Sequence, residues 1–175
     1  IVKRFEQKSV SEREEVIVAE RLISLFLNGN EAVRLMALPD LIEELATGFL
    51  YSECVISRRE DIVSVSFNPS AMSIEVQLAA NIQPVFNEKV RSITSACGRG
   101  LTFVSALNAN FFRPVTTNTT VLPQTIIDLM RKLQRNSSLF HDTGGVHSAA
   151  IARGDEMLFS CDDIGRHNAV DKALG

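Results

Sequence analysis

The sequence predicts a mixed α/β protein with two lobes, an α+β lobe over residues 1–120 and a second α/β lobe over residues 121–175. Three observations support this prediction. The first 80 residues contain two pairs of strand-like segments with a helical segment between them. The segment RPVTTNTT at 113–120 has the composition of a linker. After it, the pattern changes to helix, strand, strand, helix.

The first strand pair is indicated by EVIVAERLISLFL at 15–27 and by the apolar segment 31–38. Asn28, Gly29 and Asn30 between them form a turn sequence, so the two strands are expected to make a hairpin. A helix then begins after Pro39-Asp40. Its apolar face, read at helical spacing, consists of Leu41, Ile42, Leu45, Ala46, Phe49 and Leu50.

The second strand pair covers residues 61–67 and 72–78, where apolar and polar residues alternate. Asn68-Pro69-Ser70 lies between them and is a turn sequence. A second hairpin is therefore expected.

The second lobe begins with a helix at Pro123. The apolar stripe of this helix is Ile126, Ile127, Met130 and Leu133. Gly144 and Gly145 then interrupt the regular pattern. Two strands, 146–152 and 157–161, follow around a tight turn at Arg153-Gly154-Asp155.

The last predicted element is a helix over residues 166–174, which are good helix formers. A single hairpin with no later strands cannot cover both faces of an α/β sheet. We therefore expect the second lobe to be truncated at the C-terminus, at Gly175.

The composition is that of an ordinary globular protein and excludes several functions. The net charge is −3 and the 18 Lys and Arg residues are scattered, which argues against nucleic acid as a partner. No apolar run approaches the roughly 20 residues that span a bilayer, so no membrane partner is expected. The three cysteines are far apart, which fits a reducing compartment and predicts a cytoplasmic protein.

Cys97 is the first candidate for chemistry. Arg99 places a positive charge two residues away, which favours the reactive thiolate, and Gly98 and Gly100 make the backbone accessible. An exposed cysteine beside a cation suits a sulfur carrier. The alternative is a cysteine that simply packs in a turn.

Two further segments are candidates for binding a phosphate-bearing ligand. Thr143-Gly144-Gly145 can turn backbone N–H groups toward an anion. Gly165 precedes a helix whose N-terminus favours negative charge, and Arg166 adds a fork of donors. Asp162 and Asp163 are read as helix caps or as acceptors for a ribose or guanine edge. The alternative for both segments is helix capping and a tight turn.

A metal site receives little support. His147 and His167 are present, but the spacing of the histidines and cysteines matches no zinc motif. Cys161 ends an apolar strand and is read as a core residue, Cys54 as a buried one, and Asp171 and Lys172 as a solvated or structural helix face.

Four segments resemble one known family: "LPDLIEELATGFLYSE", "SACGRG", "DTGGVHSAA" and "DDIGRHNAVDKALG". They are similar, in order and over nearly the whole chain, to the formate dehydrogenase accessory sulfurtransferases of the FdhD/NarQ family. The resemblance implies a second lobe with a three-layer, cytidine-deaminase-like fold. Arg166, His167 and Asn168 then fall where zinc deaminases carry His-Ala-Glu, and since the catalytic Glu is absent, deamination is not implied.

The activity implied by the resemblance is sulfur relay. A cysteine desulfurase loads a persulfide onto Cys97, with Arg99 stabilising the thiolate, and the sulfur passes to the molybdenum or tungsten bis-guanine-dinucleotide cofactor needed by formate dehydrogenase. The residues implied to bind this cofactor, including its guanine nucleotide part, are Thr143, Gly144, Gly145, His147, Asp163, Gly165, Arg166, His167 and Asn168. A homodimer is implied as well, and no resident metal.

One departure from the family pattern concerns the cysteine loop. Members with a C-x-x-C sequence have a second cysteine where this chain has Gly100, so a neighbouring thiol on the same loop cannot resolve the persulfide. One thiol is still sufficient to hold sulfur. Two alternatives stay open, a non-catalytic chaperone that delivers the cofactor and a zinc-dependent relative of the deaminases.

Overall fold

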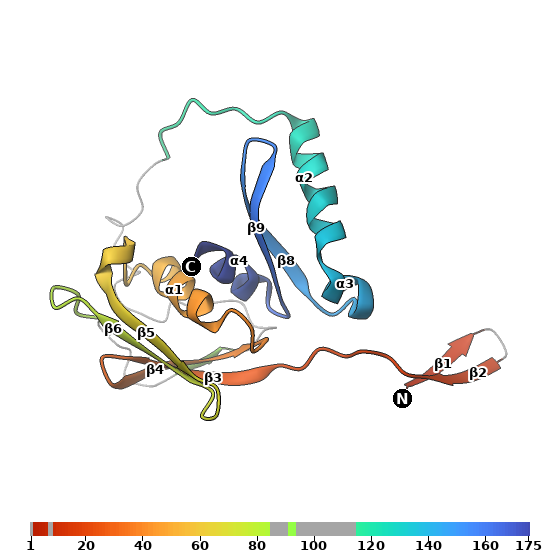
Figure 1. Ribbon diagram of the computed structural model, residues 1–175, viewed down its shortest axis with the longest axis horizontal. Helices are drawn as coiled ribbons and strands as arrows, with labels where there is room; N and C mark the ends of the chain where they lie inside the picture. Colours follow the sequence, from red (N-terminus) through yellow and green to blue (C-terminus); the bar gives the residue numbers. More distant parts are fainter. Residues whose placement is uncertain (1, 7–8, 85–90, 94–114) are drawn as a thin grey trace.

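The computed structural model describes residues 2–6, 9–84, 91–93 and 115–175, and it is a mixed α/β structure, as predicted (Figure 1). Three groups of strands are present in these ranges: a short hairpin, a five-stranded sheet and a C-terminal hairpin. The short hairpin pairs β1 (Val2–Glu6) with β2 (Ser9–Arg13) and lies apart from the rest of the molecule (Figure 1).

The five-stranded sheet contains both predicted hairpins. Its strands are β3 (Arg21–Leu27), β4 (Asn30–Ala37), β5 (Ile62–Asn68), β6 (Ser73–Leu78) and β7 (Arg91–Ile93), in the order β5-β6-β3-β4-β7. The β3–β4 and β5–β6 pairs are antiparallel, whereas β6 runs parallel to β3 and β7 parallel to β4. Both hairpin predictions are confirmed.

The first strand is shorter than predicted. It begins at Arg21 rather than at residue 15, and Ile17 is 78% exposed. The β-branched residues before Arg21 have strand propensity, but no neighbouring strand of the described sheet pairs with them. Strand propensity alone does not make a strand without a partner.

Helix α1 (Ile42–Ser52) covers one face of the sheet and supplies much of the core (Figure 1). The predicted apolar face is confirmed, since its five helical members are almost fully buried: Ile42, Leu45, Ala46, Phe49 and Leu50. Leu41 lies just before the helix in a left-handed conformation (φ 50°). A short 3₁₀ turn, η1 (Arg59–Asp61), leads from this helix into β5.

The second part of the chain has the predicted order of helix, strand, strand, helix, with one short helix added. Its elements are α2 (Pro123–Asn136), α3 (Ser138–Thr143), β8 (His147–Arg153), β9 (Glu156–Asp163) and α4 (Arg166–Leu174). The turn between β8 and β9 contains Gly154 at φ 62°, a conformation that glycine adopts without strain. Helix α4 lies between α1 and the β8–β9 hairpin (Figure 1).

The predicted apolar stripe of α2 is wrong in part. Leu133 is 8% exposed, but Ile126, Ile127 and Met130 are each about half exposed. Within the described ranges, helix α2 packs mainly against the narrow β8–β9 hairpin, which covers one side of the helix.

Helices α1 and α4 cross with their backbones in contact. A Cβ atom on Gly48 of α1 would overlap the backbone carbonyl oxygen of Asp171 in α4. The hydroxyl of Ser52 also donates to Asp171 (2.7 Å). This contact joins the first and second parts of the chain, and the predicted lobe boundary at residue 120 stays a prediction. None of the helices in the described ranges is long and apolar enough to cross a bilayer.

Candidate functional site

The two predicted binding segments meet at one end of the β8–β9 hairpin. His147, the first residue of β8, is paired with Asp163, the last residue of β9. Gly145 precedes this pair and Gly165 follows it. Because antiparallel strands bring the start of one strand beside the end of the next, the two segments lie at the same end.

The Thr143-Gly144-Gly145 segment forms a closed turn. Gly144 ends α3 in the left-handed conformation, and its N–H donates to the carbonyl of Phe140 (2.7 Å). The Thr143 hydroxyl donates to the carbonyl of Leu139 (2.6 Å) and accepts from the N–H of Gly145 (3.1 Å). Both glycine N–H groups are therefore bonded within the turn, and neither is directed at an external anion in this structure.

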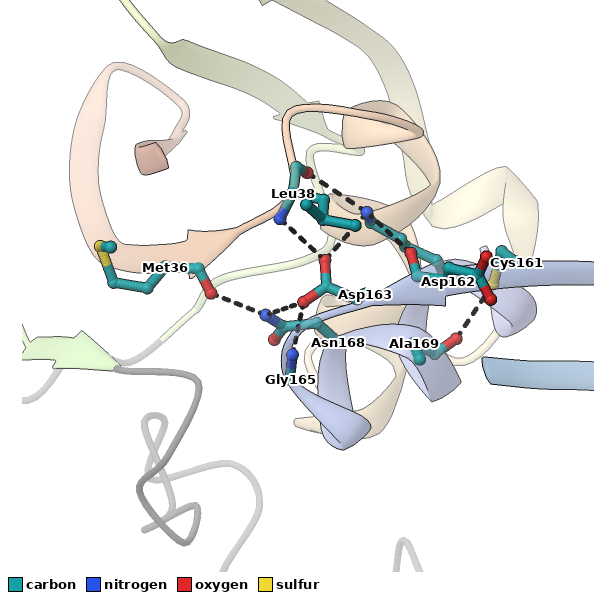
Figure 2. A network of polar contacts seen from close by, with 9 residues as sticks. Met36, Leu38, Cys161, Asp162, Asp163, Gly165, Asn168 and Ala169 are labelled. Atoms are coloured by element: carbon teal, nitrogen blue, oxygen red, sulfur yellow. Dashed lines mark hydrogen bonds and ion pairs between the residues drawn. The ribbon is translucent and has the colours of Figure 1, made fainter. Parts of the chain in front are cut away.

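Asp163 lies at the centre of a buried polar network (Figure 2). Its Oδ1 accepts from the N–H of Gly165 (2.8 Å) and from Nδ2 of Asn168 (3.1 Å). Its Oδ2 accepts from the N–H of Leu38 (3.0 Å) and forms an ion pair with Nζ of Lys172 (2.9 Å). Four donors on a single carboxylate are what a buried charge requires.

Lys172 and Asn168 extend this network to the end of β4. Nζ of Lys172 donates to the carbonyl of Leu38 (3.2 Å), and Nδ2 of Asn168 donates to the carbonyl of Met36 (2.8 Å). Figure 2 shows Asn168 between Met36 and Asp163. The network therefore connects α4 to a strand more than 120 positions earlier in the chain.

The position of Asp163 corrects its predicted role. Its side chain has 0% exposure, so it cannot touch a cofactor directly in this structure. Asn168 and Gly165 are also buried. These three residues shape the start of α4. The N-cap residue is Gly165, and no side chain caps the helix, so Asp163 binds the N–H of the residue before the helix rather than acting as its cap.

Lys172 and Asp171 were expected on a solvated or structural face, and the solvated reading is wrong, since both are 1% exposed. The importance of Lys172 was missed. A signal was present, because Asn168, Asp171 and Lys172 are spaced so as to share one side of a helix. That this side of the helix faces the backbone at the end of β4 could not be predicted from the residue pattern.

Three further residues lie at this end of the hairpin in the described part of the chain: Arg166, His147 and His167. Arg166 is the first residue of α4 and is exposed, with no hydrogen bond or ion pair to the part of the chain that the structure describes. His147 is exposed and His167 half-buried. A helix N-terminus with an arginine favours a phosphate or carboxylate.

A small cavity lies beside His147. It measures about 160 Å³, and its walls include Met130, Phe140, Val146 and His147. Asp162 is the residue before Asp163 in β9, and its carboxylate accepts from the hydroxyls of Ser137 and Ser148. Asp162 is therefore engaged within the protein.

Cys97 and Arg99 lie outside the described residues. The last described residue before them is Ile93 of β7, which is paired with Leu35 of β4. Strands β4 and β7 are parallel, so β7 ends beside Leu35, one residue before Met36.

The structure also shows how far the two described cysteines are buried. Cys161 is a core residue, as predicted, whereas Cys54 is half-buried rather than buried. Within the described ranges, no group of three or more His, Cys, Asp or Glu residues is arranged to hold a metal ion.

The fold and the site together define a mixed α/β protein whose C-terminal helix, bonded to the N-terminal sheet through a buried ion pair, presents an arginine at its start. This chain belongs to the FdhD/NarQ family, because the sequence model of that family matches residues 18–175. The family resemblance seen in the sequence is thus confirmed.

Individual relatives agree with this assignment. The chain is 36% identical over 172 residues to the sulfur carrier protein FdhD of Wolinella succinogenes, covering 97% of this chain and 59% of that protein. It is 34% identical over 173 residues to the sulfur carrier protein FdhD of Bacillus licheniformis, covering 98% of this chain and 66% of that protein. The chain thus spans roughly three fifths to two thirds of the length of these relatives.

A solved structure has the same fold. The crystal structure of a protein described as a formate dehydrogenase accessory protein from Desulfotalea psychrophila superposes with a TM-score of 0.69 at 23% sequence identity. The match covers 99% of this chain and 62% of that chain. At this identity the likeness establishes the fold.

Proposed function

We propose that this protein is a sulfur carrier, which accepts sulfur from a cysteine desulfurase on Cys97 and passes it to a molybdenum or tungsten bis-guanine-dinucleotide cofactor for formate dehydrogenase. The observation that carries the proposal is the match to the FdhD/NarQ family over residues 18–175, a range that includes Cys97. Relatives named as sulfur carriers align with nearly the whole chain.

The loading step is a thiol–persulfide exchange. The Cys97 thiolate attacks the outer sulfur of the desulfurase persulfide, the sulfur–sulfur bond of that persulfide breaks, and the desulfurase cysteine leaves as a thiolate. The reaction moves one sulfur atom and needs no external oxidant. Arg99 favours the attacking thiolate because it adds a positive charge nearby in the sequence.

The other two cysteines are poor competitors for this sulfur. Burial raises the pKa of the Cys161 thiol to about 11, so at neutral pH it stays protonated. Burial also raises the pKa of Cys54, with a further contribution from the charge of Glu53. Since the thiolate is the nucleophile, Cys97 is left as the acceptor.

The cofactor is proposed to lie at the end of the β8–β9 hairpin where Arg166 begins α4. The diphosphate of a guanine dinucleotide is the kind of anion that a helix N-terminus and an arginine bind. The apolar cavity beside His147 suits the flat face of a base. Thr143, Gly144 and Gly145 contribute the shape of the adjacent turn, and His167 lies next to Arg166 in the same helix turn.

Release of the sulfur requires two electrons. A Cys97 persulfide and two external thiols give the Cys97 thiol, one disulfide and hydrogen sulfide, whose sulfur becomes a ligand of the metal. Gly100 removes the second thiol of the C-x-x-C form, so the thiols are supplied by another molecule, such as a reduced thiol of the glutathione or thioredoxin class.

The proposal includes a setting and an assembly. Persulfide chemistry with free thiols suits the reducing cytoplasm. A homodimer is part of the proposal as well, and light scattering on the full chain checks it by giving the mass of the particle in solution.

Mass spectrometry tests the loading step. After incubation of the full chain with a cysteine desulfurase and cysteine, one sulfur atom is expected on Cys97, and none on Cys97→Ala. Absence of sulfur from the wild type, or equal sulfur on the variant, contradicts the proposal. If Cys97→Ala restores formate dehydrogenase activity in a strain lacking this gene, the protein is instead a chaperone that holds the cofactor without transferring sulfur.

A further inference from the structure

The buried network around Asp163 lies at the start of α4, next to Arg166 in the chain. We propose that the side chains of Asp163, Asn168 and Lys172, called here the α4 anchor, position Arg166 for sulfur transfer. The inference rests on the proposed function, because it assumes that Arg166 meets the cofactor and that Cys97 delivers the sulfur.

The first argument is that the anchor joins the start of α4 to the end of β4. On one side, Asp163 accepts from the N–H of Gly165, one residue before Arg166. On the other side, the anchor bonds to Met36 and Leu38 at the end of β4. Strand β7, which leads toward Cys97, is paired with β4 at Leu35.

The second argument concerns the chemistry of the contact. Every group that the anchor meets on β4 belongs to the main chain: the carbonyl of Met36 and both the N–H and the carbonyl of Leu38. Main-chain groups keep their position when the side chains of β4 change. The three anchor side chains therefore hold the start of α4 to backbone groups at the end of β4.

The third argument is energetic. Burying an ion pair is costly, and apolar residues of similar size often stabilise a fold equally well. The pair between Lys172 and Asp163 is completely buried, with 0% exposure of both side chains. Hydrogen bonds differ from apolar contacts in being directional, so a buried polar contact sets an orientation that an apolar one leaves free.

The experiment separates loading from transfer in the full chain. The double variant Asp163→Asn with Lys172→Met removes both charges together, so no unpaired charge stays buried. Lys132→Met is the matched control, because Lys132 is exposed on α2 and donates only to the backbone carbonyl of Asp155. Transfer is measured as loss of sulfur from loaded Cys97 to the bis-guanine-dinucleotide cofactor in the presence of a thiol, and melting temperature reports folding.

We expect the double variant to load Cys97 at the wild-type rate and to transfer sulfur between about 10-fold and 100-fold more slowly, because misplacement by an ångström has effects of this size. The control transfers at the wild-type rate. Adding Arg166→Ala to the double variant should slow transfer little further, since the anchor acts through Arg166. A structural role alone would lower loading and transfer together, in step with melting.

Three results overturn the inference. One is transfer at the wild-type rate by a folded double variant, and another is equal loss of loading and transfer. The third is full additivity with Arg166→Ala. Failure of the wild-type chain to load sulfur is a different result: it defeats the proposed function, and the inference falls with it. If the double variant does not fold, Asn168→Ala, which keeps the ion pair, is measured in the same way with the same expectation.

Discussion

At the scale of single residues, Cys161 shows how burial changes chemistry. Its thiol is 7% exposed and donates to the carbonyl of Ala169 (3.2 Å). Burial raises its pKa from 9.0 to about 11, and nearby Asp162, Asp163 and Asp40 act in the same direction against Lys172. This cysteine is a structural residue at neutral pH.

The raised pKa of Cys161 predicts a loss of stability in alkali. Below pH 9 the thiol is protonated in both states, so it does not affect the free energy of unfolding. Between pH 9 and about 11 only the unfolded state loses the proton, so this free energy falls as the pH rises, by about 3 kcal/mol in total.

Urea denaturation at several pH values checks this prediction against Cys161→Ser. Serine keeps a hydroxyl that can donate to Ala169 but does not ionise in this range. The wild type should lose more stability than the variant between pH 9 and 11. Parallel pH profiles for the two proteins would show that the thiol ionises as easily in the folded state as in the unfolded state.

Arg166 gives a second prediction at this scale. Arg166→Ala should weaken the binding of guanosine diphosphate to the full chain on the order of tenfold, because charge-assisted hydrogen bonds to a phosphate are lost. The melting temperature should not change, since Arg166 is exposed. Isothermal titration calorimetry measures the affinity.

The control for this prediction is Arg153→Ala. Arg153 is also exposed but lies at the other end of β8, beside the Gly154 turn. Its loss should leave the affinity unchanged. Equal weakening by both substitutions would indicate a general charge effect rather than a site at the start of α4.

At the scale of helices and strands, the close crossing of α1 and α4 depends on Gly48. Gly48→Ala places a methyl group against the backbone of Asp171, which cannot move independently of its helix. We expect the free energy of unfolding to fall by about 3 kcal/mol, the upper part of the usual cost of overpacking. Thermal and urea denaturation measure it.

The neighbouring substitution Thr47→Ala serves as control. Thr47 is on the same helix, and its hydroxyl donates only to the carbonyl of Glu43 within that helix. Its effect should stay within about 0.5 kcal/mol. A cost for Gly48→Ala no larger than this would mean that the two helices are further apart than the structure places them.

Helix α2 offers a comparison between two of its own apolar residues. Leu133→Ala should cost about 2 kcal/mol because Leu133 is packed against the β8–β9 hairpin, whereas Ile126→Ala, at a residue 53% exposed, should cost less than about 0.5 kcal/mol. Urea denaturation of both variants measures the difference. Equal costs would show that another surface covers Ile126 in solution.

The same elements show what the sequence could predict. The β3–β4 hairpin, α1 and the β8–β9 hairpin were predictable because their apolar periodicity and turn residues are local signals. The exposure of Ile126 and Ile127 was not, because periodicity reports that a helix has an apolar side and not which element is available to cover it. Residues 15–20 are not a strand for a similar reason, because strand propensity does not show whether a neighbouring strand is available to pair with them.

At the scale of the whole molecule, the candidate site could be predicted only in part. The pairing of the start of β8, at His147, with the end of β9, at Asp163, follows from the predicted hairpin, which is a local pattern. The roles of Asp163 and Lys172 were not foreseen. Their partners are backbone atoms of β4, and a backbone partner leaves no trace in the identity of the residues at 36–38.

One contact joins the N-terminal sheet to the last helix in the described part of the chain. The end of β4 and the start of α4 meet where the buried ion pair between Asp163 and Lys172 lies, and β7 is paired with β4 as far as Leu35. The proposed function places the bound cofactor at this start of α4. The central claim is that sulfur held by Cys97 reaches the cofactor bound there.

The most direct test follows radioactive sulfur from Cys97 into the cofactor. The full chain is loaded by a cysteine desulfurase with labelled cysteine, freed of that enzyme, and mixed with bis-guanine-dinucleotide cofactor and a thiol. We expect the label to leave Cys97 faster when the cofactor is present, and to be recovered bound to the cofactor. Release as free sulfide at the same rate with and without the cofactor would contradict the account.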